Sequence, residues 1–136
     1  MKILVSACLL GRNCKYNGGN NHCPAVIEYV KGHEVIPVCP EVLAGLGTPR
    51  IPIEIVSGEV MTKDGRSVDK ALRQAVAQIL LENPDADCAI LKSRSPTCGV
   101  NQVYDGTFSG VLRDGSGILA QALMDSGIKT MDSEDI

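Results

Sequence analysis

The sequence predicts an α/β fold, a single three-layer domain over residues 1–136 with a mostly parallel sheet flanked by helices, plus a small hairpin. Short apolar segments alternate along the chain with segments of helical spacing. Strands that are separated by helices join through right-handed crossovers into a parallel sheet, so we expect four or five strands with helices on both faces. Hydrophobic residues make up 44% of the chain and charged residues 21%, as in globular domains.

Short runs rich in apolar and β-branched residues indicate the strands of this sheet. Such runs are typical of strands that are buried on both faces. We predict strands at residues 2–7, 34–38, 87–91 and 128–131. Ile53–Val56 and Glu59–Met61 flank Ser57-Gly58, which is a turn sequence, and predict the small hairpin.

Start and stop signals mark the helices. Pro24 opens one helix and Gly32 ends it, and Pro40 opens a short helical turn that reaches Ala44. The longest helix is indicated by apolar residues at helical spacing, with Ser67 as N-cap and Asn83-Pro84 as stop. These apolar residues are Val68, Ala71, Leu72, Ala75, Ile79 and Leu80.

A last helix surrounds Ile118–Leu123 and ends at Gly127. The sequence Gly115-Ser116-Gly117 precedes it. Free amides at such a helix start can bind an anion, so this segment is a weak candidate for an anion site. An internal repeat and a low-complexity linker are both absent from the sequence.

Charge and composition exclude several classes of partner. The net charge of −3 and the mixed signs do not form the basic stripe of a protein that binds a nucleic-acid polymer. Aromatic residues are only 3% of the chain, too few for a base-stacking surface. We expect no membrane span, since every apolar run is far shorter than about 20 residues. The apolar run before Cys8 is too short for a secretory signal.

We therefore expect a cytoplasmic protein, a monomer or small homo-oligomer, whose thiols stay reduced. Three of its six cysteines follow predicted strands: Cys8 after residues 2–7, Cys39 after residues 34–38, and Cys98 in the loop after residues 87–91. In an open α/β sheet, ligands bind beyond the carboxyl ends of the strands. Three thiols at that edge favour a metal or cluster site.

The other three cysteines have plainer interpretations. Cys88 lies inside a strand and is predicted to be in the core. Cys14 and Cys23 lie in the first long loop, and both are interpreted as loop thiols near the surface, with a reactive Cys23 as the alternative. The chain contains no C-x2-C pair, so the spacing of a zinc ribbon or ferredoxin is absent.

Six motifs in order resemble the family known as domain of unknown function 523, whose characterised members are thiouracil desulfidases. The resemblance covers nearly the whole chain, with two departures, Lys15 and Asn17, where Arg and Asp are expected. The motifs are Ser6-Ala7-Cys8-Leu9-Leu10-Gly11, Asn13-Cys14-Lys15-Tyr16-Asn17-Gly18, Pro37-Val38-Cys39-Pro40-Glu41, Thr48-Pro49-Arg50, Leu91-Lys92-Ser93-Arg94-Ser95-Pro96-Thr97-Cys98-Gly99 and Tyr104-Asp105-Gly106-Thr107-Phe108-Ser109-Gly110.

The resemblance implies a [4Fe-4S] cluster held by Cys8, Cys39 and Cys98, with one iron left without a protein ligand. It also implies functional roles for Glu41 and Ser95. The substrate would be a small thiolated base, 2-thiouracil or a similar pyrimidine, which loses its sulfur as sulfide.

The chemistry of such a reaction is consistent with these residue types. A thiocarbonyl sulfur is soft and suits iron, and iron binding polarises the carbon–sulfur bond for attack by water. Glu41 is the candidate general base, with capping of the short helix as its structural alternative. Ser95 would orient the substrate or bond to a cluster sulfide, or it is only a turn residue before Pro96. Asp105 is another candidate acid, although Asp-Gly is also a turn signal.

Lys92 and Arg94 are interpreted either as neutralising the charge of the cluster or as a solvated face. Two other functions stay open from the sequence. A sulfurtransferase would carry a persulfide on Cys14 or Cys23 and would need no iron. A non-catalytic iron–sulfur or zinc module would hold metal and release no sulfide.

Overall fold

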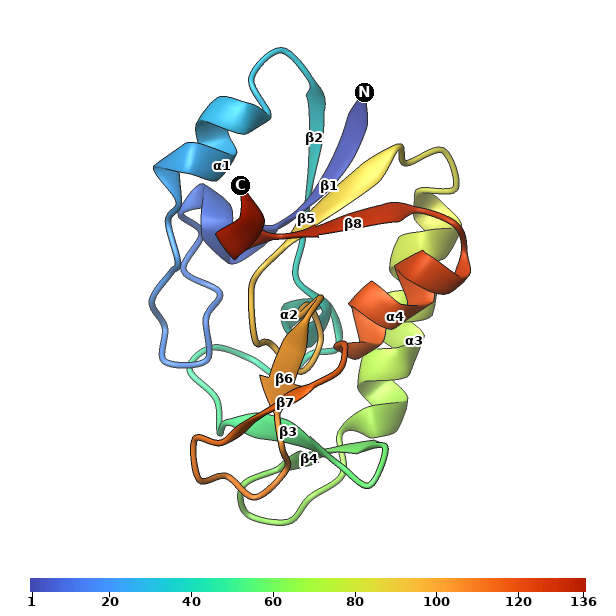
Figure 1. Cartoon of the computed structure of the whole chain (residues 1–136). Coiled ribbons are helices and arrows are strands. Elements are labelled where there is room, and N and C mark those ends of the chain that lie inside the picture. The colour runs from blue at the N-terminus through green and yellow to red at the C-terminus, as the bar shows by residue number, and fades with distance from the viewer.

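The computed structural model describes residues 1–136 and has an α/β fold, which confirms the predicted fold class (Figure 1). Its main sheet has four parallel strands in the order β2-β1-β5-β8. The predicted strands are all present, each within one residue of its expected ends. Their bounds are Lys2–Ser6 for β1, Glu34–Val38 for β2, Cys88–Leu91 for β5 and Lys129–Asp132 for β8.

Helices cover both faces of the sheet, as expected. Successive side chains of a strand point to opposite faces, and β1 follows this rule. Ile3 and Val5 pack with Val26 of α1 (Pro24–Tyr29) on one face, whereas Leu4 packs on the other face. That second face is covered by α3 (Asp69–Glu82) and α4 (Ile118–Asp125). None of the helices is long and apolar enough to cross a membrane.

The start of α3 corrects one detail of the prediction. Ser67 is not its N-cap, because the helix begins at Asp69 and Val68 occupies the cap position. The Ser67 hydroxyl instead donates a hydrogen bond to the carboxylate of Glu59, at 2.6 Å. The Ser67 oxygen also accepts from the amide of Asp69, at 3.5 Å, so the serine lies beside the helix start without occupying the cap position.

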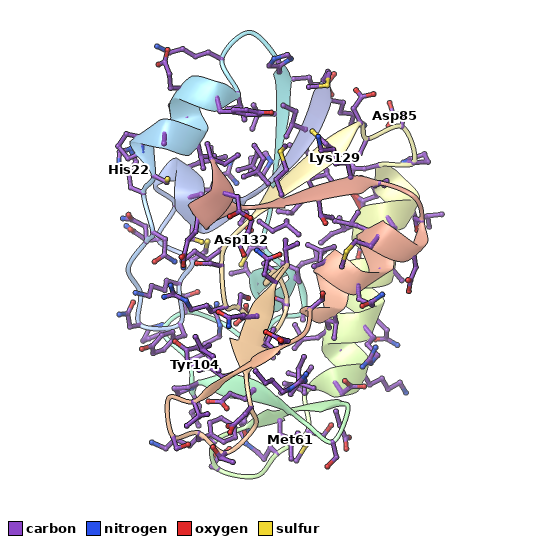
Figure 2. The ribbon with its side chains drawn as sticks, viewed as in Figure 1. His22, Met61, Asp85, Tyr104, Lys129 and Asp132 are labelled. Carbon is purple, nitrogen blue, oxygen red and sulfur yellow. The ribbon has the colours of Figure 1, made fainter.

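Two hairpins lie beyond the carboxyl edge of the sheet (Figures 1 and 2). In Figure 2, Asp85 and Lys129 lie near the amino ends of the strands, and Met61 and Tyr104 lie in the hairpins on the other side. The hairpin of β3 (Ile53–Val56) and β4 (Glu59–Thr62) was predicted. The hairpin of β6 (Gln102–Tyr104) and β7 (Leu112–Asp114) was not predicted.

The beginning of α4 holds the loop that follows β5. The amides of Ile118 and Leu119 donate to the carbonyls of Pro96 and Thr97, at 3.1 and 2.8 Å, and Gly117 donates to Gly99 at 2.7 Å. The Gly115 amide likewise donates to the Asn101 carbonyl, at 3.1 Å, so two of the three amides suggested for an anion are bonded to the chain itself. Their role is to fix the loop that carries Cys98.

Candidate functional site

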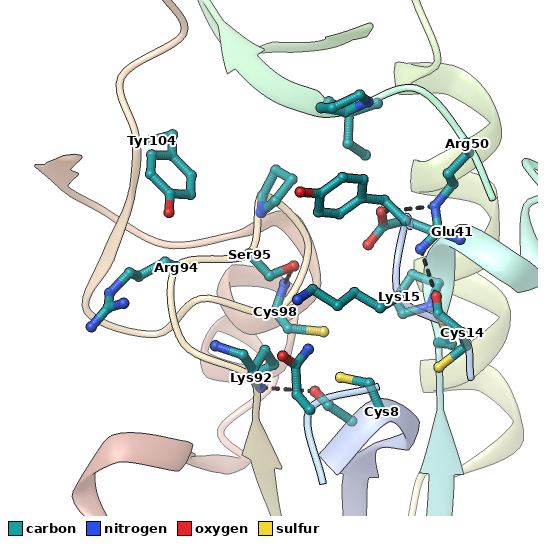
Figure 3. Close-up of a pocket in the computed structure, with 18 of the residues that line it drawn as sticks. Cys8, Cys14, Lys15, Glu41, Arg50, Lys92, Arg94, Ser95, Cys98 and Tyr104 are labelled. Atoms are coloured by element: carbon teal, nitrogen blue, oxygen red, sulfur yellow. Dashed lines mark hydrogen bonds and ion pairs between the residues drawn. The ribbon is translucent and has the colours of Figure 1, made fainter. Parts of the chain in front are cut away.

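A cavity of about 520 Å³ lies between the carboxyl edge of the sheet and the two hairpins. The loops after β1, β2 and β5 form its sheet side, and β3 and β6 contribute to its other side. The structure brings Cys8, Cys39 and Cys98 together in this one cavity, and Cys14 also lines it. Figure 3 shows the sulfur atoms of Cys8 and Cys98 facing a common space, with Glu41 above them.

The topology explains why these loops meet. After β1 the chain adds β2 on one side and later returns to add β5 on the other side of β1. Loops that leave β1 and β5 therefore diverge, which creates the crevice in which open α/β sheets bind ligands. Cys8 lies in a 3-10 helix, Ala7–Leu10, directly after β1.

The other two cysteines are held by local structure. Cys39 is the N-cap residue of α2 (Pro40–Leu43), and its Sγ lies 4.0 Å from the carbonyl oxygen of Cys14. Cys98 is buried in the turn after β5, where its Sγ is 3.7 Å from the hydroxyl of Thr97. The Cys98 amide donates to Ser95 Oγ at 3.1 Å.

Burial disfavours the charged form of these thiols. It raises the pKa of Cys98 to about 12, against hydrogen bonds from Ser6 and Thr97 that lower it. Burial also raises the pKa of Cys8, while a hydrogen bond with Asn21 and the charge of Lys92 act in the opposite direction. Thiolates at these positions need a positive partner, and metal binding supplies one because ligand thiols lose their protons to the metal.

The donor set fits a cluster better than a single ion. No group of three or more His, Cys, Asp or Glu side chains surrounds a point where one metal ion could bind. A [4Fe-4S] cluster instead takes cysteine ligands on separate iron atoms, so its cysteines surround a volume. Cys8, Cys39 and Cys98 line such a volume from three loops.

The cavity carries more positive than negative side chains. Lys15, Arg50, Lys63, Lys92 and Arg94 line it, against the two carboxylates of Glu41 and Glu54. Lys92 lies at the cavity wall, where its Nζ donates to Ser93 Oγ at 2.8 Å. Arg94 forms an ion pair with Glu134 at the surface. This balance suits the negative charge that three thiolates introduce.

Glu41 lies in the first turn of α2 and lines the cavity. One of its oxygens accepts from Arg50 Nε at 3.3 Å, and both side chains are largely buried, with 15% and 6% exposed. The other oxygen accepts from the Thr97 hydroxyl at 3.1 Å. Ser95 also lines the cavity and contacts the same hydroxyl, at 3.0 Å.

Asp105 does not line the cavity. Its carboxylate accepts from the amide and hydroxyl of Thr107, and these hydrogen bonds lower its pKa. This geometry matches the turn interpretation of the Asp-Gly sequence. Between the two acidic candidates, Glu41 is the one that the structure places at the thiols.

Arg50 and Thr97 both contact Glu41 and lie in the motifs, but neither was among the predicted site residues. The guanidinium of Arg50 bonds to the Cys14 carbonyl at 2.8 Å and to the Gly47 carbonyl at 2.9 Å, besides Glu41. It thus connects α2 to the first long loop (Figure 3). The two prolines around Arg50 indicated a stiff segment, but no sequence signal indicated its buried partner.

The remaining cysteines are all free thiols. Cys88 is buried in β5, as predicted. Cys23 is the N-cap residue of α1 and packs against the apolar cluster on the α1 face, away from the cavity. Burial, together with nearby Cys39, raises the pKa of Cys14 to about 12.

Fold and site together define an α/β protein with a thiol-lined pocket beyond β1 and β5, where the loops leave its parallel sheet in opposite directions. Comparison with family models then identifies the family. The 2-thiouracil desulfurase model matches residues 3–135, so the chain belongs to that family. This confirms the resemblance drawn from the six motifs.

Two individual proteins are similar over nearly the whole chain. The uncharacterized protein YbbK of Bacillus subtilis (strain 168) is 34% identical over 146 residues, which covers 98% of this chain and 97% of YbbK. The solved structure of the [4Fe-4S]-dependent thiouracil desulfidase TudS superposes with a TM-score of 0.92 at 32% identity. That match covers 99% of this chain and 92% of the TudS chain.

Proposed function

We propose that this protein is a [4Fe-4S]-dependent desulfidase that removes sulfur from a small thiolated pyrimidine-like base, converting 2-thiouracil to uracil and sulfide. The observation that carries the proposal is the meeting of Cys8, Cys39, Cys98 and Glu41 in a single cavity. The family match and the similarity to TudS support it. A volume of about 520 Å³ lies within the range of small-molecule pockets.

Cys8, Cys39 and Cys98 are the residues that would hold the cluster. When bound through three thiolates, such a cluster offers an iron atom that binds a soft sulfur and polarises the carbon–sulfur bond. Lys92 lies beside Cys8 and offsets part of the negative charge of these ligands. Glu41 and Ser95 would act on the water and on the substrate.

Glu41 acts as the general base in this proposal. Its carboxylate pairs with Arg50 Nε at 3.3 Å, and its position in the cavity wall gives it access to a water molecule beside the substrate carbon. Ser95 orients the substrate from the opposite loop. The backbone amides of Thr97 and Cys98 both donate to its oxygen, which fixes the direction of its hydroxyl.

A reaction with 2-thiouracil under anoxic conditions tests the proposal. Protein loaded with iron and sulfide should release uracil and sulfide, and the same protein without its cluster should release neither. Uracil is followed by chromatography and sulfide by a colorimetric assay. The proposal fails if fully loaded protein yields no uracil from 2-thiouracil and no sulfide from 4-thiouracil or small thioamides.

The same experiment distinguishes the desulfidase from the two alternatives, a persulfide carrier and a non-catalytic metal-binding module. A persulfide carrier would work without the cluster, and it needs a reactive thiolate. Burial raises the pKa of Cys14 to about 12, which disfavours its thiolate, and Cys23 lies outside the cavity. A binding module would hold the cluster and form no uracil.

A further inference from the structure

Glu54 is a buried acidic residue of the cavity to which the proposed chemistry gives no role. It lies on β3, is only 8% exposed, and lines the cavity from the hairpin side. Its oxygen Oε1 accepts from the amides of Gly106 and Phe108, at 3.0 and 3.2 Å, and Oε2 has no partner within the chain. No fully enclosed side-chain oxygen of the protein lacks a partner, so Oε2 reaches open space, and the space that Glu54 lines is the cavity.

The lack of a cationic partner sets Glu54 apart from the other carboxylate of the cavity. Burying an acidic side chain is costly, so buried Glu residues are normally paired. Glu41 follows this rule through its ion pair with Arg50. Glu54 forms no ion pair and has only the two amides on Oε1. Oε2 therefore offers an unsatisfied acceptor to a molecule that occupies the cavity.

The loop between β6 and β7 holds the Glu54 side chain in one orientation. A Cβ atom at Gly106 would lie 2.5 Å from the carbonyl oxygen of Ile55, so this loop packs directly on β3. Phe108 has a φ of 55°, in the left-handed region that bulky residues rarely adopt. Both residues direct their amides at Oε1, and Oε2 is the oxygen left for the cavity.

Aromatic residues gather around the same cavity. Tyr16, Tyr104 and Phe108 line it, and Tyr29 is the only other aromatic residue of the chain. Aromatic side chains bind flat rings by stacking. The cavity thus combines flat apolar surface with one unsatisfied acceptor, which suits a planar heterocycle that carries an N–H group.

We propose that Glu54 is a specificity-determining residue that accepts a hydrogen bond from a ring N–H of the thiolated base, an inference that rests on the proposed function. In 2-thiouracil the thiocarbonyl carbon lies between two ring N–H groups. A carboxylate can only accept, so Oε2 selects the form of the ring that carries its proton on nitrogen and not on sulfur. The substrate class is therefore a thiolated pyrimidine with a free N–H beside the thiocarbonyl, and a substituent on that nitrogen leaves Oε2 without a partner.

Replacing Glu54 by Gln converts this acceptor into a donor and leaves the loop in place. The amides of Gly106 and Phe108 need an oxygen, so the Gln carbonyl takes the position of Oε1 and its NH2 group faces the cavity. Two donors then meet at the substrate N–H. With the loaded enzyme, we expect KM for 2-thiouracil to rise on the order of 10–100-fold. We expect kcat to change little, because the lost contact binds substrate and transition state alike.

Methylated substrates distinguish N–H recognition from a structural role. 1-Methyl-2-thiouracil and 3-methyl-2-thiouracil each lack one ring N–H. For one of them, kcat/KM of the wild type should fall on the order of 10–100-fold relative to 2-thiouracil, and Glu54→Gln should lose this discrimination. Uracil keeps both N–H groups and has no sulfur to lose. Its dissociation constant, measured by calorimetry on the loaded protein, should therefore rise in Glu54→Gln without any turnover.

Glu59→Gln is the matched control, because Glu59 lies on β4, the strand paired with β3, and outside the cavity. Its KM and its uracil affinity should be those of the wild type, and all three proteins should bind the same amount of iron. Turnover by the wild type with equal KM in Glu54→Gln would overturn the role of Glu54 and leave the desulfidase function standing. Equal rejection of the methylated substrates by both proteins would also overturn it, since a methyl group that only clashes with the wall is rejected without Glu54. Absence of turnover in the fully loaded wild type would overturn the proposed function, and the inference with it.

Discussion

Glu41 is the residue on which the proposed chemistry depends most. Its two carboxylate oxygens are held by different parts of the chain, one by Arg50 and the other by Thr97. A carboxylate fixed in this way keeps one orientation toward the cavity. The bond to the Arg50 guanidinium is an ion pair between two largely buried side chains.

Replacing Glu41 by Gln keeps the shape of the side chain and removes its basicity. We expect kcat to fall by roughly 10²–10⁴-fold, as is typical for loss of a general base, while the iron content stays that of the wild type. Glu59→Gln is the matched control. The Glu59 carboxylate also accepts from a hydroxyl, that of Ser67, and it lies outside the cavity.

An unchanged kcat in Glu41→Gln with full iron would show that Glu41 only caps α2.

Among single residues, the sequence indicated Glu41 and Ser95 through their motifs, but it did not indicate that the Thr97 hydroxyl joins them. The bond between Thr97 and Glu41 connects residues 56 positions apart. Such a contact depends on how α2 sits against the loop after β5, which no local pattern describes.

Among the elements, α4 has the most direct influence on the site. Its first amides hold the carbonyls of the Pro96–Thr97 segment, so the helix fixes the loop that presents Ser95 and Cys98. Gly117 permits this close approach. A Cβ atom at Gly117 would lie 2.4 Å from the backbone carbon of Thr97 and 2.8 Å from the amide nitrogen of Cys98.

Gly117→Ala should therefore push α4 away from the site loop. The backbone of Gly117 is in the extended region, at φ −68° and ψ 163°, which alanine adopts freely, so the effect is steric. We expect a lower free energy of unfolding, by roughly 1–3 kcal/mol as for overpacked sites, and a loss of bound iron. Chemical denaturation and an iron assay measure the two effects.

Gly19→Ala is the control for this experiment. A Cβ atom at Gly19 would meet only the side chain of Asn17, at 3.0 Å, and this exposed side chain can move. Stability and iron content should stay near those of the wild type. Equal behaviour of the two alanine variants would contradict the role assigned to α4.

The predictability of the elements follows from their burial. The strands of the main sheet and the helix α3 have continuous or periodic apolar residues, and the sequence located them within one or two residues. The hairpin of β6 and β7 was missed because each strand has three residues and only Val103 is fully buried. Pairing across this hairpin leaves little trace in the hydrophobic pattern.

For the whole molecule, the order of the strands decides where the chemistry lies. Cys8, Cys39 and Cys98 follow β1, β2 and β5, which are neighbours in the sheet. Parallel strands place their carboxyl ends at one edge, so the sequence was able to predict that these cysteines meet. The hairpin of β6 and β7 and the buried pair of Arg50 and Glu41 were not predicted. Three expectations stay predictions: a single domain over residues 1–136, a monomer or small homo-oligomer, and a cytoplasmic location.

The assignment of the cluster ligands makes the last prediction. Single alanine substitutions of Cys8, Cys39 and Cys98 should each lower the iron retained after anoxic reconstitution, from about four atoms per chain for one [4Fe-4S] cluster toward none. The physical reason is that each thiol would hold a separate iron atom. Iron and acid-labile sulfide are measured together with the absorbance of the cluster.

The other cysteines provide matched controls. Cys88→Ala changes a buried thiol on a strand of the same sheet, and Cys23→Ala changes one at the start of α1, so both should keep full iron. Cys14→Ala is the sharpest comparison, because Cys14 lines the same cavity. Its thiol is expected to be dispensable, since three strand ends already supply the ligands. Full iron in Cys39→Ala, or its loss in Cys14→Ala, would assign the third ligand to the first long loop and not to the end of β2.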